Sequence, residues 1–295
     1  MRPAFTLGQV WLAERLAWRA TPRVPEPAMV MDDAQQVDDY AAAGDDHGAM
    51  SPTHLFHSAQ AAALIQPGDR VLDLGCGPGT QLIQLASLRH DASFVGVDLS
   101  DAMLDQAARR SADAGLTNID WQPADITRLD AFADASFDMV ISSMTLHHLP
   151  TAADLHRCFA EVRRVLREAG RVYFGDFARL HTATAMRALA HMRADQQPDY
   201  FTRDYYNSLR AAFSPQQWRE AADAARLDHH APLHHHVTRP IGLMQIMHSP
   251  PPADIDPALR HAIDTRRDNL GPTARQDLAA IVKLFRSAGL ATVVR

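Results

Sequence analysis

The chain has 295 residues, 46% of them hydrophobic and 22% charged, so it can bury a sizeable core and global disorder is excluded. Its formal net charge of -6 and pI near 6.2 offer no general attraction to nucleic acid or to an anionic membrane surface, so a small-molecule ligand fits better. The only cysteines, Cys76 and Cys158, cannot build a disulfide framework or a cysteine zinc site. A cytoplasmic location is expected, and no apolar run reaches membrane-spanning length.

Residues 1–37 are expected to form an extension ahead of the main domain. The first 30 residues are basic and carry apolar residues at the spacing of a short amphipathic helix. Such a beginning faintly suggests a transit peptide, but an extension that packs on the domain, or a true start at Met29 or Met31, is favoured. The prolines within residues 22–27 end any helix there.

A helix is predicted from about Pro52 to Ile65. Ser51 is a good N-cap, and proline is favoured at the first helical position. The Pro67-Gly68 pair then stops the helix, so residues 38–66 lead into the first strand.

Residues 71–79, Val-Leu-Asp-Leu-Gly-Cys-Gly-Pro-Gly, indicate a strand that runs through a glycine turn into a helix. The three glycines let the backbone turn tightly and approach a ligand closely, and apolar residues recur with helical spacing after Thr80. A ligand is therefore expected at the carboxyl end of this strand, beside a helix N-terminus. A nicotinamide dinucleotide site would need glycine in place of Thr80, so NAD is disfavoured.

The pattern Asp-x-Gly-x-Gly-x-Gly resembles the first motif of class I S-adenosylmethionine-dependent methyltransferases. That resemblance implies that the glycine loop, with Gly75, Cys76, Gly77 and Gly79, lies against the methionine end of the cofactor. It also implies that Asp73 helps to hold the cofactor's ammonium group.

A second strand, residues 92–98, ends in an acid about twenty residues after the glycines. The two carboxylate oxygens of Asp98 match two vicinal ribose hydroxyls. The following residues resemble the family's second motif, in which Leu99 and Met103 line the adenine face, and Ser100 is expected to cap the next helix.

A third strand, residues 119–123, is followed by another acid. The resemblance assigns Asp125 to the exocyclic amine of adenine and the backbone amide of Ile126 to a ring nitrogen. Taken alone, Asp125 is equally a helix cap. Three acids that each follow a successive strand favour the methyltransferase interpretation.

The fourth strand, residues 137–143, brings Ser142 and Ser143 to the cofactor site and continues into a double histidine. His147 and His148 are the candidate catalytic residues. His147 is expected to be a general base or to orient the acceptor, because an imidazole titrates near neutral pH. His148 is expected to point away and to hydrogen-bond the backbone; a structural role for both histidines stays open.

The next helix is expected to begin after Thr151, which forms nearly a capping box with Asp154, and to end at Gly170. Residues 171–177 then form the fifth strand.

In the methyltransferase family that the motifs resemble, an insertion after this strand commonly covers the substrate, so residues 178–213 are expected to form a helical lid. Candidate substrate residues lie in this lid and in the segment before the first strand: Tyr40, His54, His57, Tyr200, Tyr205, Tyr206 and Arg210. Simple packing of the lid aromatics, and surface positions for the two histidines, are the alternatives.

A helix is predicted from Pro215, with Ser214 as its cap, to about residue 227, followed by strands near 229–237 and 240–247. The first of these strands contains several histidines, but alternation places His234 and His236 on one face and His235 on the other. No metal site is expected there, nor elsewhere in the chain.

The predicted fold is α/β: a doubly wound, Rossmann-like sheet of seven strands, mostly parallel with an antiparallel end. The methyltransferase domain is expected to span 38–248, with the lid as an insertion. Residues 249–295 form an extension of two helices that meet near Gly271. This tail either packs on the domain or joins two subunits as a homodimer.

The function implied by the resemblance is transfer of the methyl group of S-adenosylmethionine to an oxygen or nitrogen atom of a small organic acceptor, with S-adenosylhomocysteine as product. C-methylation of an enolisable or phenolic carbon is the alternative within the class. A cofactor-binding protein without turnover is disfavoured by the intact motifs and the lid. The sequence does not identify the acceptor.

Overall fold

The computed structural model describes residues 7–27, 41, 43, 48–192, 194, 199–228, 232–239, 241–252 and 254–294. Tyr40, one of the candidate substrate residues, lies outside these ranges, as do His229, His230 and Pro240. No helix in the described ranges is long and apolar enough to cross a lipid bilayer.

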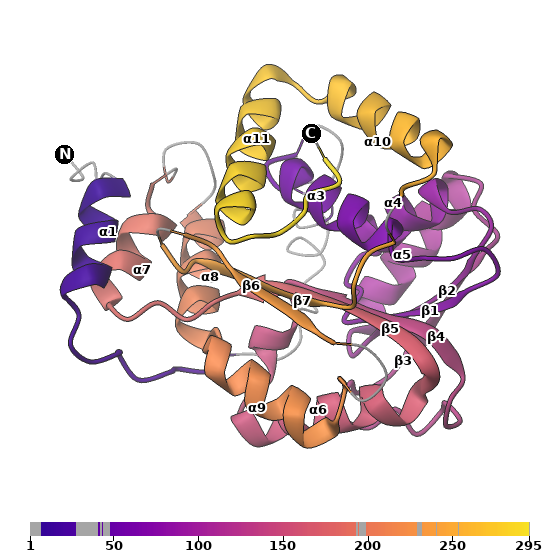
Figure 1. Ribbon diagram of the computed structural model, residues 1–295, viewed down its shortest axis with the longest axis horizontal. Coiled ribbons are helices and arrows are strands. Elements are labelled where there is room, and N and C mark those ends of the chain that lie inside the picture. The colour runs from indigo at the N-terminus through magenta and orange to yellow at the C-terminus, as the bar shows by residue number, and fades with distance from the viewer. Residues whose placement is uncertain are drawn as a thin grey trace.

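A seven-stranded sheet with the order β3-β2-β1-β4-β5-β7-β6 forms the centre of the molecule (Figure 1). Strands β1 to β5 are parallel, β7 runs antiparallel to β5, and β6 is antiparallel to β7. The predicted doubly wound sheet with an antiparallel end is therefore confirmed. The strands are β1 (Arg70–Leu74), β2 (Ser93–Asp98), β3 (Ile119–Pro123), β4 (Phe137–Ser143), β5 (Leu166–Phe177), β6 (His234–Val237) and β7 (Met244–His248).

Helices cover both faces of this sheet (Figure 1). On one face lie α3 (Ser51–Ala62), α4 (Thr80–Leu88), α10 (Pro257–Asn269) and α11 (Pro272–Ser287), and α5 (Asp101–Asp113) follows beside α4. The other face carries α6 (Ala152–Val165) and α9 (Pro215–Ala225). Three helices lie beyond the β6–β7 end: α1 (Leu7–Leu16), α7 (Ala183–Ala190) and α8 (Asp199–Ala211).

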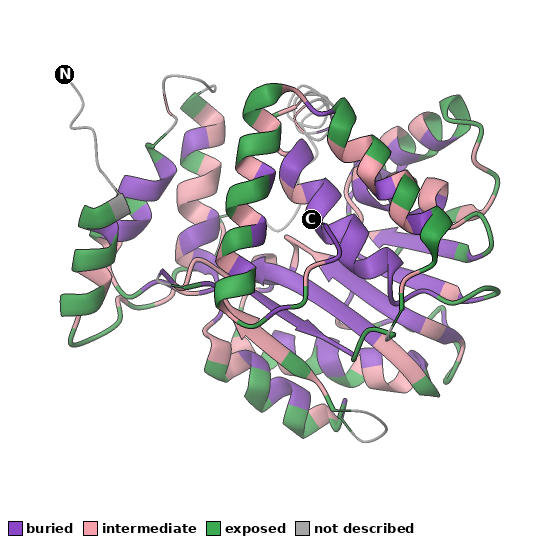
Figure 2. Cartoon of the chain, turned by 45° about the horizontal axis from the view of Figure 1, so that its top comes forward, coloured by how far each residue is buried: buried purple, intermediate pink, exposed green. Residues whose placement is uncertain are grey.

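Side chains alternate between the two faces of each strand, and this alternation divides the core. Val71 packs with the α3 side, whereas its neighbour Leu72 packs with α6 and α9. Because both faces are covered, successive residues of the central strands are buried rather than alternately buried and exposed (Figure 2).

Three helix starts have the predicted caps, but the cap predicted for α3 is wrong: Ser51 is the first residue of the helix, Met50 precedes it, and no side-chain hydrogen bond caps this end. The Ser100 hydroxyl accepts the Met103 amide at 3.2 Å, and full capping boxes join Thr151 with Asp154 and Ser214 with Gln217. Each box satisfies backbone amides that have no partner within the helix.

The expected end of α6 at Gly170 is wrong. The helix ends at Val165, and Leu166 turns into extended backbone and pairs with Phe137, so β5 already contains Gly170. A Cβ at Gly170 would lie 2.4 Å from Cγ of Leu166, so glycine serves a close approach inside the strand rather than a helix stop. The helix α3 also ends earlier than expected, at Ala62.

Both terminal segments pack on the central domain. The N-terminal helix α1 contributes Val10 to an apolar cluster with Met186 of α7 and Leu209 of α8. At the other end, α10 and α11 lie against α3, where the rings of Phe56 and Phe285 stack at 5.0 Å. Their outer faces are exposed (Figure 2).

We predict that Gly79→Ala destabilises the fold more than Gly68→Ala. Both glycines have φ near +80°, at +75° and +82°, so each alanine costs about 1–2 kcal/mol of backbone strain. At Gly79 the new Cβ would also lie 2.6 Å from the Trp121 ring and 2.9 Å from Cβ of Ala107, which adds roughly 1–3 kcal/mol of overpacking. Urea unfolding of both variants measures the difference, and equal losses of stability would contradict the close packing.

Candidate functional site

A cavity of about 630 Å³ opens at the carboxyl ends of the parallel strands. This is the edge where an open α/β sheet binds its ligands. One end of the lining contains the predicted cofactor residues: Asp73, Gly75, Cys76, Gly77, Asp98, Leu99, Met103, Asp125, Ile126 and Ser143. The other end contains residues from the N-terminal segment, α3, the histidine loop and α8, among them Glu26, His54, His147, His148, Tyr200, Asp204 and Tyr205.

The glycine loop after β1 is fastened to its neighbours by its backbone. The amides of Gly75 and Cys76 both donate to the carbonyl of Val97, at 2.8 and 2.9 Å. A Cβ at Gly75 would lie 2.0 Å from the Thr145 side chain, so no other residue fits beneath the histidine loop. Gly79 does not line the cavity, because it faces α5 instead.

Three acids from three successive strand ends meet in this cavity, as predicted. The Asp98 carboxylate accepts the amides of Gly77 at 2.9 Å and of Ser100 at 3.0 Å, which ties it to the glycine loop and to the start of α5. Asp125 accepts the amide and the hydroxyl of Thr127, both at 2.8 Å. These backbone bonds hold the carboxylates in place before any ligand binds.

Burial, together with the nearby Asp98 carboxylate, raises the pKa of Asp73 to about 7. A cationic ligand group beside Asp73 would compensate both effects. The same surroundings raise the pKa of the Cys76 thiol well above its usual range, so this cysteine stays protonated and is a poor nucleophile.

The two serines at the end of β4 have different positions. Ser143 lines the cavity and hydrogen-bonds the side chain of Gln81, whereas Ser142 is buried and donates to the carbonyl of Leu74 at 3.0 Å. Ser142 therefore fastens β4 to β1, and the structure does not bring it to the expected cofactor site.

His147 is held by Asp176 at the end of β5. One carboxylate oxygen lies 2.7 Å from Nδ1 of His147, and the other accepts its backbone amide at 2.9 Å. Nδ1 therefore carries a proton toward Asp176, and Nε2 is the nitrogen left for a ligand. Burial disfavours the imidazolium, but the Asp176 charge and hydrogen bond outweigh it, so the pKa of His147 is raised.

The expectation that His148 points away to the backbone is wrong. His148 lines the cavity beside His147, with the two ring centres 4.3 Å apart, and its Nδ1 is buried without a hydrogen-bond partner. Burial, and then the neighbouring His147, lowers the pKa of His148 to about 3. This imidazole is neutral at physiological pH.

The N-terminal connector, residues 17–27, reaches this loop through Arg23. The guanidinium donates to the carbonyls of Pro150, Leu149 and His147, at 2.5, 2.6 and 2.9 Å, and to that of Ala211 at the end of α8, at 2.6 Å. One side chain thus joins the connector, the histidine loop and α8.

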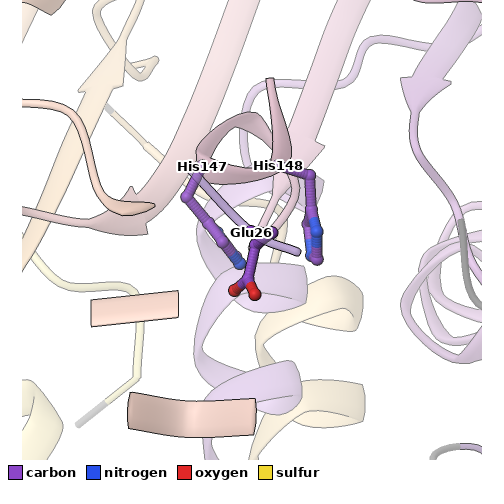
Figure 3. A group of neighbouring side chains, drawn as sticks. All are labelled: Glu26, His147 and His148. Carbon is purple, nitrogen blue, oxygen red and sulfur yellow. The ribbon is translucent and has the colours of Figure 1, made fainter. Parts of the chain in front are cut away.

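Glu26, three residues further along the connector, enters the cavity. Its Oε1 accepts the hydroxyl of Ser208 of α8 at 2.8 Å, and burial raises its pKa. Glu26, His147 and His148 form a group whose possible metal-ligand atoms all lie within 4.8 Å of one another (Figure 3).

The two histidines of α3 are separated by the structure. His54 lines the cavity, but His57 is fully buried, with Nδ1 2.7 Å from the hydroxyl of Tyr173. A Cβ at Gly175 would lie 2.5 Å from the His57 ring, so His57 packs against β5 rather than against a substrate.

The side chains of α8 are divided in the same way. Tyr200 and Tyr205 line the cavity, and the Tyr205 ring packs on Phe177 with centres 5.4 Å apart. Tyr206 and Arg210 are outside the cavity lining, where the Arg210 guanidinium lies 5.4 Å from the centre of the Tyr206 ring.

Sequence reasoning missed Asp176, Glu26, Arg23 and Asp204. Asp176 could have been found from the sequence. It lies near the end of the fifth strand, and the three expected acids likewise lie at or just after the ends of their strands. Glu26 and Arg23 lie in a proline-rich segment outside the expected domain, where no pattern pointed to the site.

Residues 71–170 match a family whose model is described as a methyltransferase domain. A 27-O-demethylrifamycin SV methyltransferase of Amycolatopsis mediterranei is 33% identical over 125 residues, covering 42% of this chain and 44% of that protein. This chain thus spans less than half of that relative. A ubiquinone biosynthesis O-methyltransferase of Coxiella burnetii is 28% identical over 194 residues, covering 63% and 80%.

Solved structures share the fold. An S-adenosylmethionine-dependent methyltransferase of Aquifex aeolicus gives a TM-score of 0.52 at 15% identity, covering 74% of this chain and 98% of its own. A proposed enzyme of the same class from Methanococcus maripaludis gives 0.52 at 17% identity, covering 80% and 100%.

Proposed function

Residues 71–170 match the model of a methyltransferase domain, and on this premise we propose that the chain is a class I methyltransferase that transfers the methyl group of S-adenosylmethionine to an oxygen or nitrogen atom of a small organic acceptor. The observation that carries the proposal is one continuous cavity, with three acids and the glycine loop at one end and His147 at the other. The cofactor is already activated, so the chain has to align two reactants and exclude water.

The cofactor end offers a complementary group for each polar part of S-adenosylmethionine. Asp73 would face the ammonium group, Asp98 the ribose hydroxyls, and Asp125 with the Ile126 amide the adenine edge. Leu99 and Met103 add apolar surface for the base. The acceptor would then occupy the other end.

In the proposed step, a lone pair of the acceptor attacks the sulfonium methyl carbon from the side opposite sulfur. The carbon–sulfur bond breaks, its electron pair stays on sulfur, and S-adenosylhomocysteine leaves. When the acceptor is a hydroxyl or an ammonium, Nε2 of His147 takes its proton, and Asp176 stabilises the resulting imidazolium.

Oxygen is the favoured acceptor atom. One relative is named an O-methyltransferase and the other a methyltransferase of a 27-O-demethyl compound. C-methylation of an enolisable or phenolic carbon is the second candidate, since His147 would serve it equally.

The function is tested by incubating the chain and S-adenosylmethionine with a library of phenols, hydroxylated macrocycles, amines and enolisable ketones. The S-adenosylhomocysteine formed is measured. If no acceptor is turned over, a binding protein without catalysis is favoured.

We further propose that the methyltransferase domain spans about 38–248, with the lid at 178–213 and a C-terminal extension at 249–295. The N-terminal extension would then complete the acceptor end, because Glu26 lines the cavity.

Asp98→Ala should weaken S-adenosylhomocysteine binding about tenfold to a hundredfold. The change removes charge-assisted hydrogen bonds worth roughly 1.5–3 kcal/mol. Isothermal calorimetry on the variant and the parent chain measures this, with NAD as a ligand that neither should bind. An unchanged affinity would remove Asp98 from the cofactor site.

Cofactor affinity should fall as the pH drops below 7. The carboxylate of Asp73 binds an ammonium group, and with a pKa of about 7 it is ionised above that pH and protonated below it. Affinity should therefore be highest above pH 7. Below pH 7 it should fall, and the slope should approach about tenfold per pH unit. In Asp73→Asn the affinity should be lower and its dependence near pH 7 should be lost; a persisting dependence would assign the titration to another group.

Tyr205→Ala should raise the acceptor KM about tenfold and leave cofactor affinity nearly unchanged, because Tyr205 lines the acceptor end. Tyr206→Ala is the matched control, since the same ring one position later lies outside the cavity lining, near Arg187 and Arg210. Steady-state kinetics on both variants decide; equal effects would indicate packing rather than substrate contact.

His147→Ala should lower kcat about a hundredfold to ten-thousandfold at saturating cofactor. His147→Gln keeps a hydrogen-bonding group of similar length, so it separates orientation from proton transfer. Asp176→Asn should reproduce a large part of the loss, because it weakens the bond that directs Nε2 into the cavity. Normal activity of His147→Ala would end the assignment.

A further inference from the structure

The acceptor end of the cavity holds a convergent group of three side chains that the methyl-transfer step does not require together. Figure 3 shows Glu26 with its carboxylate between the imidazoles of His147 and His148. Each residue offers one possible ligand atom, and these atoms all lie within 4.8 Å of one another. Among the residues that the structure describes, no other group of three or more histidine, cysteine, aspartate or glutamate side chains brings its possible ligand atoms this close together.

The first ligand, His147, is prepared by a neighbour behind it. Asp176 binds Nδ1 at 2.7 Å, which fixes the ring and directs Nε2 toward Glu26 and His148. A carboxylate on the far nitrogen of a histidine is the usual support of metal-binding imidazoles, because it sets the tautomer and increases the basicity of the ligand.

The second ligand, His148, has a buried ring nitrogen without a hydrogen bond, Nδ1, and its ring centre lies 4.3 Å from that of His147. A buried imidazole of this kind costs stability unless a ligand compensates it, and the neutral form is the one that binds cations.

The third ligand, Glu26, is placed by a hydrogen bond to α8 and by the connector that carries it. Ser208 donates to its Oε1, which leaves the other carboxylate oxygen for a cation. Arg23 ties the connector to the histidine loop through the carbonyls of His147, Leu149 and Pro150. The carboxylate and both imidazoles are therefore held in one rigid unit.

We propose that Glu26, His147 and His148 bind one divalent transition-metal cation, of the Zn²⁺ or Co²⁺ type, at the acceptor end of the cavity. Two imidazoles and one carboxylate suit these cations, whereas Mg²⁺ and Ca²⁺ prefer oxygen ligands. Three protein ligands leave a coordination position open, as in catalytic rather than structural zinc sites.

The open position gives the cation a role that rests on the proposed function. An acceptor hydroxyl bound there would lose its proton to solvent more readily, and its oxygen would be aimed at the methyl group. The cation and a proton compete for Nε2 of His147, so in the loaded site the cation replaces His147 in activating the hydroxyl. Such a site selects acceptors with an oxygen that can coordinate a metal.

The test is a spectrophotometric titration of the full-length chain with Co²⁺, with Zn²⁺ as competitor, and needs no acceptor. We expect one Co²⁺ per chain, with visible bands of a four- or five-coordinate site that Zn²⁺ abolishes and excess Mg²⁺ does not. Glu26→Gln and His148→Asn should each lower the affinity at least about tenfold, and Asp176→Asn about tenfold to a hundredfold.

The matched control is His236→Asn. It alters a second histidine group, His234, His236 and His248, whose ring centres are 5.4 to 6.3 Å apart, and should leave Co²⁺ binding unchanged. Absence of a bound equivalent, loss of binding in His236→Asn, or full affinity in both Glu26→Gln and His148→Asn would overturn the proposal.

S-Adenosylhomocysteine binding, measured on the same samples, separates this proposal from the proposed function. Variants that keep it are folded, so their loss of Co²⁺ is a loss of ligands. A parent chain that binds Co²⁺ but no S-adenosylhomocysteine would retain the metal site and refute the methyltransferase activity, whereas the reverse result would refute the metal site alone.

Discussion

The loop after β4 depends on being held from two sides by opposite charges. The Asp176 carboxylate accepts the backbone amide of His147 and binds its ring, while the Arg23 guanidinium takes the carbonyls of His147, Leu149 and Pro150. Hydrogen bonds to charged groups are among the stronger ones inside a protein. The position of both imidazoles in the cavity follows from this pair of contacts.

The two ends of the cavity use their charged groups differently. At the cofactor end, Asp98 and Asp125 are tied to backbone amides, and Asp73 is left to meet a cationic ligand. At the acceptor end, Glu26 and the histidines face one another without an intervening backbone bond. The first end is thus suited to one fixed ligand. The second end is built by loop and connector residues, which differ more between related proteins, so it suits ligands that differ from one protein to another.

The N-terminal connector contributes residues to the acceptor end of the cavity. Residues 17–27 precede the expected domain, yet Arg23 reaches the loop after β4 and Glu26 reaches the cavity. Arg23 also binds the carbonyl of Ala211 at the end of α8, so the connector and α8 meet at the same guanidinium. A change at either element should therefore be felt at the histidines, through direct contacts rather than over a distance.

The sequence alone predicted the sheet, three of the helix caps and most residues that line one end of the cavity, because those features are local: apolar runs, glycines and an acid at or after the strand ends recur within a few residues of one another. Only the tertiary structure decided the acceptor end, where Glu26 meets His147 across more than a hundred residues of sequence. It also decided that Tyr205 rather than Tyr206, and His54 rather than His57, faces the cavity, since each step along a helix turns a side chain by about 100° and three steps turn it by about 300°. The local sequence does not show which of these side chains faces the cavity. The orientation of the helix about its own axis decides this, and that orientation is set by the elements against which its opposite face packs.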